Sequence, residues 1–254
     1  MRIHPRASSF GGAADAYERA RPGYPDAAVD AAAERLGLTS SASVLDLAAG
    51  TGKLTRSLAR RFAHVSAVEP IDNMRAVLQR AVPEARALAG TAEAIPLDDG
   101  AVDAVWVGEA FHWFDVARAV PELARVVRGR GGVAVLYNRK GWADAREPPW
   151  VSACHAVFQH HRTPDDGVDP HDTEEWRAAL AGCFGALQES VVEHVHAVSA
   201  ADVVALYASF SGIAGLAPDA RAAALAEIRE VLDRHAIQRA EVSYRTVVVT
   251  ARRP

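Results

Sequence analysis

The residues most suited to chemistry are a short glycine-rich segment, 46–52 (DLAAGTG), and the acidic residue Glu69. The segment follows an apolar run at 43–45 and precedes a helix-like stretch at 53–60, so the order is strand, glycine-rich turn, helix. Glycine tolerates positive φ and has no side chain, so a ligand can approach such a turn closely. Glu69 ends a second apolar run at 65–68, where a carboxylate can bind the two hydroxyls of a nucleotide ribose. The pattern predicts a site for an adenosine-containing cofactor.

Two phosphate-binding alternatives fit this segment less well. A dinucleotide fingerprint needs a third small residue where Thr55 stands, and that residue allows close helix packing and pyrophosphate approach. A P-loop needs glycine where Leu47 stands and a hydroxyl where Leu54 stands. What remains is an acidic residue followed by small residues at alternate positions, namely Asp46, Ala48, Gly50 and Gly52. An ordinary strand-to-helix turn stays as the alternative without function.

Apolar runs and helix-like stretches alternate along the first 138 residues. We predict further strands at 85–89, 101–107 and 133–137, and a helix that opens within 70–74, with Asp72 or Asn73 as its cap, and runs to about Ala81. A second helix is predicted at 115–128, followed by a turn at 130–132. Continuous apolar strands separated by helices are typical of a parallel sheet that is covered on both faces. Ligands of such sheets bind beyond the carboxyl ends of the strands, which is where the loops quoted above lie.

The pattern changes after Tyr137. We expect two or three short helices within 139–182, a strand at 191–198, helices at 200–210 and 218–235, and a last strand at 241–250. The helical material is too long for plain connections, so we expect a lid over the cofactor edge. The prediction is a single domain over 1–254, with a cofactor-binding core at 1–138, a helical lid and substrate region with one strand at 139–240, and a terminal strand at 241–254.

Composition narrows the function classes. The chain has 254 residues, half of them apolar, enough for the core of one large domain. The net charge is −4 and no Lys/Arg run occurs, which argues against nucleic acid as the partner. No apolar stretch approaches the ~20 residues of a membrane span, and no apolar signal core follows Met1. The two cysteines form no C-x-x-C pair, so we expect reduced thiols and a cytoplasmic location.

Four motifs in order resemble the class I S-adenosylmethionine-dependent methyltransferases, in the small-molecule branch with trans-aconitate methyltransferase-like enzymes. Segment 46–52 resembles their motif I, whose loop faces an amino acid and a nucleoside. Segment 10–25 resembles the N-terminal Y-x-x-x-R-P-x-Y helix, and 90–93 (GTAE) resembles the G-D-A-E loop, with Thr91 replacing aspartate. Segment 108–115 (GEAFHWFD) resembles A-Q-A-x-H-W-F-D, which lines the methyl-transfer site.

This resemblance implies a Rossmann-like α/β fold, with a mostly parallel seven-stranded sheet, an antiparallel last strand and a helical lid insertion. It implies S-adenosyl-L-methionine as cofactor, S-adenosyl-L-homocysteine as product and a small-molecule acceptor. The implied cofactor-binding residues are Tyr17, Arg21, Asp46, Ala48, Gly50, Gly52, Glu69, Pro70, Met74, Thr91, Ala92, Glu93, Glu109 and Phe111. Tyr17 and Arg21 would lie near the methionine carboxylate, for which the arginine fork is suited. Because Thr91 replaces the family's aspartate, the side-chain hydrogen bond to the exocyclic amine of adenine would shift to Glu93 or disappear.

The sulfonium methyl is already activated, so the protein's main task is to position a nucleophile and exclude water. His112 is the candidate base for a phenol, alcohol or acidic carbon, because imidazole titrates near neutral pH. For a carboxylate acceptor it would bind the anion instead, or it could simply bond a nearby carbonyl. Phe111, Trp113 and Phe114 can offer aromatic faces to the cationic sulfur, with Trp113 facing the substrate, or can pack in the core.

No metal is expected. The lid carries histidines and aspartates that could suggest a metal site, but adjacent or six-residue spacings do not converge on one ion. These residues are His155, His160, His161, His171, Asp165, Asp166, Asp169 and Asp172. Two other functions stay open: an NAD(P)-dependent oxidoreductase, and a non-catalytic S-adenosylmethionine-binding protein. The acceptor and the oligomeric state are not specified by these patterns.

Overall fold

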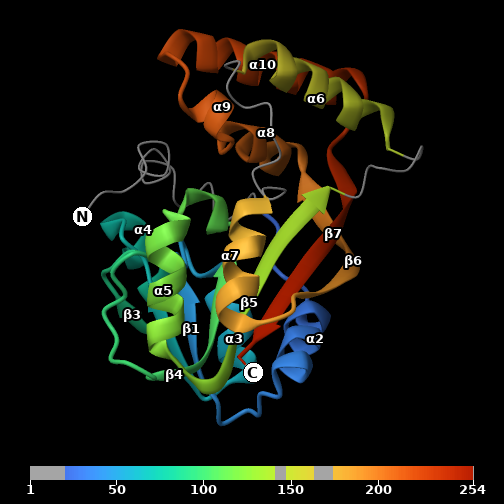
Figure 1. Ribbon diagram of the computed structural model, residues 1–254. Coiled ribbons are helices and arrows are strands. Elements are labelled where there is room, and N and C mark those ends of the chain that lie inside the picture. The colour runs from blue at the N-terminus through green and yellow to red at the C-terminus, as the bar shows by residue number, and fades with distance from the viewer. Residues whose placement is uncertain (1–20, 141–146, 163–173, 254) are drawn as a thin grey trace.

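The computed structural model describes residues 21–140, 147–162 and 174–253. Its elements, in chain order, are α2 (Asp26–Leu36), β1 (Ser43–Leu47), α3 (Lys53–Arg61), β2 (His64–Val68), α4 (Asp72–Ala81), β3 (Arg86–Leu88), β4 (Val102–Gly108), the 3-10 helix η2 (Phe111–Trp113), α5 (Val116–Val126), β5 (Val127–Lys140), α6 (Pro149–His161), α7 (Glu174–Phe184), β6 (Gln188–Ser199), α8 (Ala200–Ala208), α9 (Ser211–Ala214), α10 (Pro218–Arg234) and β7 (Arg239–Arg252). Strands and helices alternate as predicted through the first half of the chain (Figure 1).

One seven-stranded sheet runs through the molecule in the order β3-β2-β1-β4-β5-β7-β6. The five strands from β3 to β5 are parallel, and β7 is antiparallel to both of its neighbours. This confirms the predicted Rossmann-like fold with an antiparallel last strand. The strand order reverses between β1 and β4, and sheets of this kind bind ligands at such a point, beyond the carboxyl ends of the strands.

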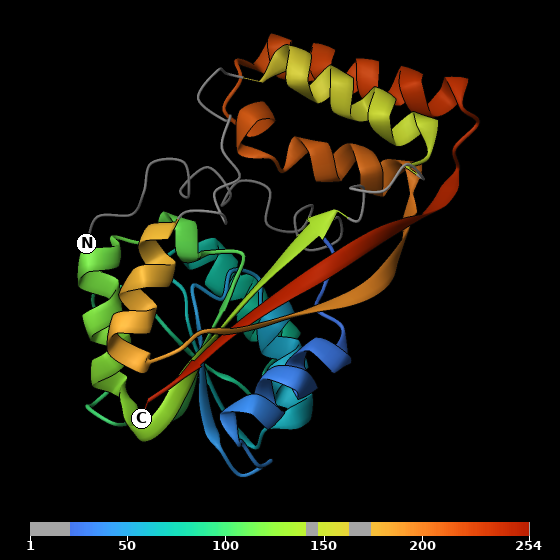
Figure 2. The same ribbon diagram turned by 45° about the vertical axis from the view of Figure 1, so that its right-hand side comes forward.

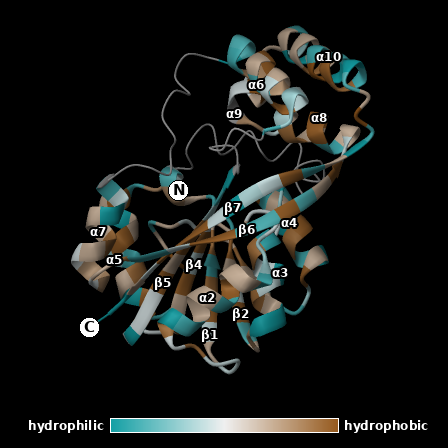
Figure 3. Cartoon of the chain, turned by 90° about the vertical axis from the view of Figure 1, so that its right-hand side faces the viewer, coloured by the Kyte–Doolittle hydropathy of each residue, from teal (hydrophilic) through white to brown (hydrophobic). Residues whose placement is uncertain are grey.

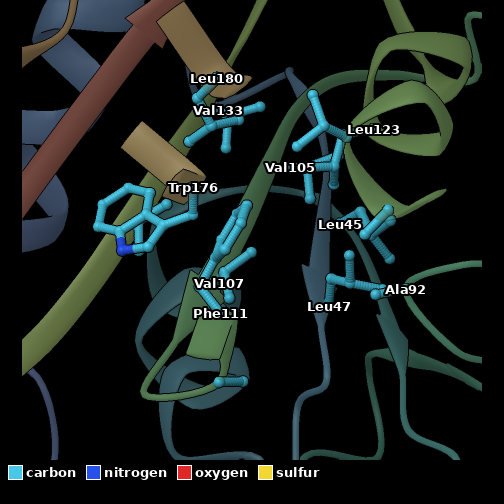
Figure 4. Packing of buried hydrophobic residues seen from close by; sticks show 14 of the residues in the cluster. Leu45, Leu47, Ala92, Val105, Val107, Phe111, Leu123, Val133, Trp176 and Leu180 are labelled. Atoms are coloured by element: carbon cyan, nitrogen blue, oxygen red, sulfur yellow. The ribbon is translucent and has the colours of Figure 1, made fainter. Parts of the chain in front are cut away.

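Two apolar cores cover the faces of the sheet. In β1, Leu45 and Leu47 pack with α5 and α7, while Val44 packs with α2 and α3, because successive side chains of a strand point to opposite faces. Figure 3 shows the resulting hydrophobic interior and the more hydrophilic outer helices. Figure 4 shows the α5–α7 core, in which the ring of Phe111 lies beside that of Trp176.

The segment 139–240 is divided between two places. Helix α7 packs against α5, and most of β6 pairs with β7 in the sheet. Helices α6, α8, α9 and α10 form a separate layer, here called the helical cap, beyond the carboxyl ends of the parallel strands (Figure 2). The helical cap has its own core, which includes Trp150, Cys154 and Tyr207 from the helices and Val242 and Tyr244 from β7.

Two local predictions are wrong. The helix predicted over 115–128 ends at Val126, and β5 includes the predicted turn at 130–132. The reason is a register shift between the pairs Val102↔Val127 and Ala104↔Gly132, which places the extra residues in a bulge of β5. Glycine is required there, since a Cβ on Gly131 would stand 2.3 Å from the backbone oxygen of Asp103.

Neither Asp72 nor Asn73 occupies the cap position of α4. That position is taken by Ile71, whose side chain makes no capping bond, and Oδ1 of Asn73 accepts the N–H of Met74 at 3.0 Å from within the first turn. The carboxylate of Glu69 accepts the N–H of Ile71 instead, and the guanidinium of Arg75 bonds the backbone oxygen of Glu69. The start of α4 is therefore held in part by Glu69, the residue that follows β2.

Candidate functional site

The loop after β1 has an unusual backbone. Ala48, Gly50 and Gly52 have φ values of 57°, 58° and 91°. A positive φ is strained for alanine, and such strain is concentrated at functional sites. Gly52 is also tightly packed, because a Cβ there would stand 3.1 Å from Cγ of Leu78. The small residues identified in the sequence therefore allow an irregular loop at the point where the strand order reverses.

Glu69 lies across this loop. Its Oε2 accepts the N–H of Gly50 at 2.8 Å, and its Oε1 accepts the N–H of Ile71 at 2.9 Å. The residue is 4% exposed, and burial raises the pKa of its carboxyl group, an effect that the two backbone N–H groups and Arg75 oppose. Each carboxylate oxygen keeps a second lone pair, so Glu69 can still accept hydrogen bonds from a ligand's hydroxyl groups.

Asp46 is buried below the same loop. Its Oδ2 accepts the hydroxyl of Thr55 at 2.6 Å, while its Oδ1 has no hydrogen-bond partner among the described residues. Burial raises the pKa of Asp46 to about 7, against the hydrogen bonds from Thr55 and with a smaller contribution from the charge of Glu69. A carboxylate oxygen is thus left without a donor at the floor of the site.

Further residues implied for cofactor binding lie in the first turn of α4 and in the loops after β2 and β3. Met74 is 5% exposed, and its methyl group lies close to Gly50. A Cβ built on Gly50 would stand 3.8 Å from this methyl carbon. Pro70 follows Glu69 directly and is partly buried. In the loop after β3, Ala92 is buried, Thr91 forms an isolated bridge with Ala94, and Oε1 of Glu93 accepts the N–H of Asp115 at 3.0 Å.

Glu109 follows β4 with a φ of 55°, a second strained residue at the carboxyl edge. Its Oε1 accepts the N–H of Asn138 at 2.5 Å, which ties the end of β4 to the end of β5. The preceding residue, Gly108, is closely approached by Tyr24. A Cβ on Gly108 would stand 2.6 Å from the hydroxyl oxygen of Tyr24, so a larger residue would displace that side chain.

The three residues of η2 divide between core and site edge. Phe111 is 2% exposed and packs 5.1 Å, centroid to centroid, from both Phe114 and Trp176. The structure therefore gives Phe111 a packing role, and its contact with a cofactor stays a prediction. His112 and Trp113 are partly buried, with ring centroids 4.6 Å apart.

Arg21 makes a contact that the sequence did not predict. Its guanidinium donates to the hydroxyl and the backbone oxygen of Ser209, at 3.0 and 3.2 Å, and lies 4.7 Å from the ring centroid of Phe210. Arg21 thus joins the segment before α2 to the helical cap, and its contact with a methionine carboxylate stays a prediction. Tyr17 lies outside the described residues, as do His171 and the aspartates between 165 and 172.

The residues present fit S-adenosylmethionine in chemical type. The buried Glu69 carboxylate has lone pairs for ribose hydroxyls, and the unpartnered Oδ1 of Asp46 is an acceptor for an ammonium group. Met74 and Ala92 provide apolar surface for a purine. Within the described ranges no group of three or more metal-ligating side chains occurs, and no helix there is long and apolar enough to cross a membrane.

Sequence reasoning missed several polar residues at this edge. Asn138 bonds Glu109 through its backbone, and its side-chain Oδ1 accepts the hydroxyl of Thr246 at 2.6 Å. Thr55 departs from a dinucleotide fingerprint, and in the structure its hydroxyl donates to Oδ2 of Asp46. The useful signal for Thr55 is its place one turn into the helix after the loop, whereas the partners of Asn138 are distant in sequence and give no local signal.

Comparisons with known proteins agree with this geometry. A family model described as a methyltransferase domain matches residues 45–135. The chain is 41% identical over 231 residues to an uncharacterized methyltransferase of Mycobacterium tuberculosis, which covers 89% of this chain and 86% of that one. It is 31% identical to a malonyl-[acyl-carrier protein] O-methyltransferase of Salmonella typhimurium, over 68% of each chain. A solved structure from Anaeromyxobacter dehalogenans, described as a candidate type II methyltransferase, has a TM-score of 0.70 at 23% identity and covers 91% of this chain and 97% of that chain.

Proposed function

The chain belongs to the class I S-adenosylmethionine-dependent methyltransferases, and on this premise we propose that it methylates an oxygen or carbon atom of a small molecule. The acceptor classes that we propose are a carboxylate, a phenol or quinol, or a secondary metabolite. Membership of this family excludes the NAD(P)-dependent oxidoreductase alternative. The second candidate function is a protein that binds S-adenosylmethionine without turnover.

The observation that carries the proposal is the carboxylate of Glu69, held across the β1 loop by the N–H groups of Gly50 and Ile71. Two backbone donors fix the carboxylate before any ligand arrives, so little ordering cost remains for binding a ribose. The positive φ values of Ala48 and Gly50 support the same assignment, because they keep the loop backbone open to a close ligand.

We assign the cofactor-binding roles accordingly. Asp46, Ala48, Gly50 and Gly52 would hold the amino-acid end and the floor, and Glu69 would hold the ribose. Met74 with the turn at 91–93 would flank the adenine. Glu109, Arg21 and Tyr17 would close the methionine side. Each of these assignments rests on the family pattern and on the position of the residue at the carboxyl edge.

When bound, S-adenosylmethionine supplies an activated methyl group, so the chain's own residues need to orient the acceptor and exclude water. We propose His112 as the base that takes the proton of a phenol, alcohol or acidic carbon. With a carboxylate acceptor, which is already ionised, His112 would instead bind the anion. The relative named as a malonyl-[acyl-carrier protein] O-methyltransferase supports the carboxylate class.

The test is release of S-adenosylhomocysteine from S-adenosylmethionine over a panel of small carboxylic acids, phenols or quinols, and amines. Turnover confined to acids would identify a carboxyl methyltransferase in which His112→Ala mainly raises KM. Turnover of phenols would assign His112 as base, and His112→Ala would then lower kcat by about 10²–10⁴-fold. Calorimetric binding of S-adenosylhomocysteine without turnover of any compound would favour the non-catalytic candidate. Absence of binding would refute the proposed function.

A further inference from the structure

Strands β6 and β7 extend beyond the rest of the sheet. The pairing of β5 with β7 ends at Lys140↔Tyr244, whereas β6 and β7 stay paired as far as Ser199↔Arg239. Figures 1 and 2 show the two strands rising from the sheet to the helical cap. Side chains on this part of the two strands therefore lie between the carboxyl edge of the sheet and the cap helices.

A row of polar side chains crosses one face of these strands. On β7, Val248 belongs to the core of α2 and α3, and Val242 belongs to the core of the helical cap. Thr246 and Tyr244 lie between them on the same face, because alternate residues of a strand share a face. The junction row, as we name it, comprises Thr246 and Tyr244 of β7 with two residues of β6, His194, which pairs with Tyr244, and His196, which pairs with Val242. The junction row lies where the core of α2 and α3 meets the core of the helical cap.

The two ends of the junction row differ in their hydrogen bonding. Thr246 and His194 both contact Oδ1 of Asn138, at 2.6 and 3.3 Å. By contrast, the hydroxyl of Tyr244 and Nε2 of His196 are buried and have no hydrogen-bond partner among the described residues. An unsatisfied buried polar atom is costly, and two on one face call for an explanation.

These two groups are close together and uncharged. The ring of Tyr244, 4% exposed, is stacked on His194 at 5.7 Å and meets His196 edge-on at 6.3 Å between centroids. Burial raises the pKa of Tyr244 to about 12, so its hydroxyl keeps its proton and can donate. Burial, followed by the charge of Lys53, lowers the pKa of His196, so that ring is neutral at pH 7.

The neighbours of the pair connect it to the cofactor site. Asn138 joins the junction row to the residue that follows β4, because its side-chain Oδ1 contacts His194 at 3.3 Å and its backbone N–H donates to Oε1 of Glu109 at 2.5 Å. The charges of Arg21 and Glu109 also act on Tyr244, and those of Lys53 and Asp202 act on His196. The unpartnered pair is therefore connected through Asn138 to the carboxyl edge of the sheet.

We propose that the Tyr244 hydroxyl and the His196 imidazole bind a carboxyl or carbonyl oxygen of the methyl acceptor. The proposal rests on the proposed function and adds the acceptor's anchoring group to it. An oxygen acceptor satisfies a neutral hydroxyl donor, whereas an apolar group would leave it unpaired. Both residues are binding residues, since the transferred methyl needs no proton from either.

The test compares Tyr244→Phe with Tyr137→Phe, the same chemical change on the adjacent strand β5. The Tyr137 hydroxyl accepts Nη2 of Arg177 at 2.8 Å, and this ring lies in the α5–α7 core on the opposite face. Each protein, saturated with S-adenosylhomocysteine, is titrated calorimetrically with acetate, malonate, succinate, benzoate and acetone, and with benzylamine as a compound without such an oxygen.

We expect at least one carboxylate or carbonyl compound to bind the wild type. Its affinity should be at least 10-fold lower for Tyr244→Phe and unchanged for Tyr137→Phe. S-adenosylhomocysteine affinity should be unchanged in both variants. Without ligand, Tyr244→Phe should raise the urea midpoint, because it removes an unsatisfied hydroxyl, whereas Tyr137→Phe should lower it.

The proposal is refuted if Tyr244→Phe binds these compounds as tightly as the wild type, or if none binds while S-adenosylhomocysteine does. Failure of S-adenosylhomocysteine to bind the wild type would instead refute the proposed function, and this proposal with it. A lower urea midpoint for Tyr244→Phe would show that its hydroxyl is already satisfied and would also refute the proposal.

Discussion

Replacing Asp46 with asparagine should remove a specific pH dependence of stability. Burial raises the pKa of this carboxyl to about 7, from an ordinary value of 3.8. The native state therefore binds the proton more tightly than the unfolded chain does. As pH rises from about 4 to about 7, the unfolded carboxyl ionises before the native one, and the free energy of unfolding falls.

The size of the effect follows from the shift. At about 1.4 kcal/mol per pKa unit, a shift of about three units makes the wild type lose up to about 4 kcal/mol between pH 4 and pH 7. The amide that Asp46→Asn introduces cannot ionise, but its oxygen can still accept the Thr55 hydroxyl. The difference in unfolding free energy between wild type and Asp46→Asn should therefore change by about 4 kcal/mol between pH 4 and pH 7. The wild type should become less stable relative to the variant as pH rises.

Urea unfolding of both proteins at pH 4, 5, 6, 7 and 8 measures this difference, because every other titrating group cancels. The matched control is Asp98→Asn, which makes the same chemical change at an exposed residue and so separates the effect of burial from the effect of the substitution. A difference that does not change with pH for Asp46→Asn would show that the buried carboxyl is solvated by water, and the reasoning on its pKa would be refuted.

Three further perturbations test other parts of the site and the core. Glu69→Gln should weaken S-adenosylhomocysteine binding by about 10- to 100-fold in calorimetry, because an amide N–H₂ must face one of the two backbone donors; unchanged affinity would remove Glu69 from the cofactor site. Gly108→Ala should lower the free energy of unfolding in urea by about 1–3 kcal/mol, because the new Cβ would contact the Tyr24 hydroxyl. Adding Tyr24→Phe should restore part of this loss, and strictly additive effects of the two substitutions would contradict the contact. Trp176→Ala should cost about 3–5 kcal/mol, because it leaves a cavity beside Phe111; a loss below about 1 kcal/mol would mean that α7 is not packed as described.

The sequence predicted the elements whose signals are local. Helix α4 and strand β4 are bounded by proline, glycine and aspartate residues that punctuate the chain, and the end of α4 and both ends of β4 were predicted to within one residue. The start of β5 was missed because Gly131 and Gly132 suggest a turn, whereas here they pack against neighbouring strands. A glycine kept for close approach has the same sequence signal as a glycine kept for a turn.

The candidate site divides in the same way. The loop after β1 and the residue after β2 are read directly from the sequence, because a parallel sheet brings the carboxyl ends of its strands together. The bonds from Arg21 to Ser209 and from Thr246 to Asn138 join residues 188 and 108 positions apart. No periodicity or spacing predicts such pairs, because they depend on how β6, β7 and the helical cap pack on the sheet.

The residues proposed to bind the acceptor belong to the part of the site that local sequence patterns do not predict. Pairs that a motif cannot encode are free to differ between proteins that share the cofactor loop, and loops and insertions on a fixed scaffold are where specificity is usually set. In this chain the unpartnered atoms of Tyr244 and His196 lie on the strands that carry the helical cap, while Asp46 and Glu69 lie on the parallel sheet. Exchanging the junction row for that of a methyltransferase relative should therefore alter acceptor preference while leaving S-adenosylhomocysteine affinity unchanged.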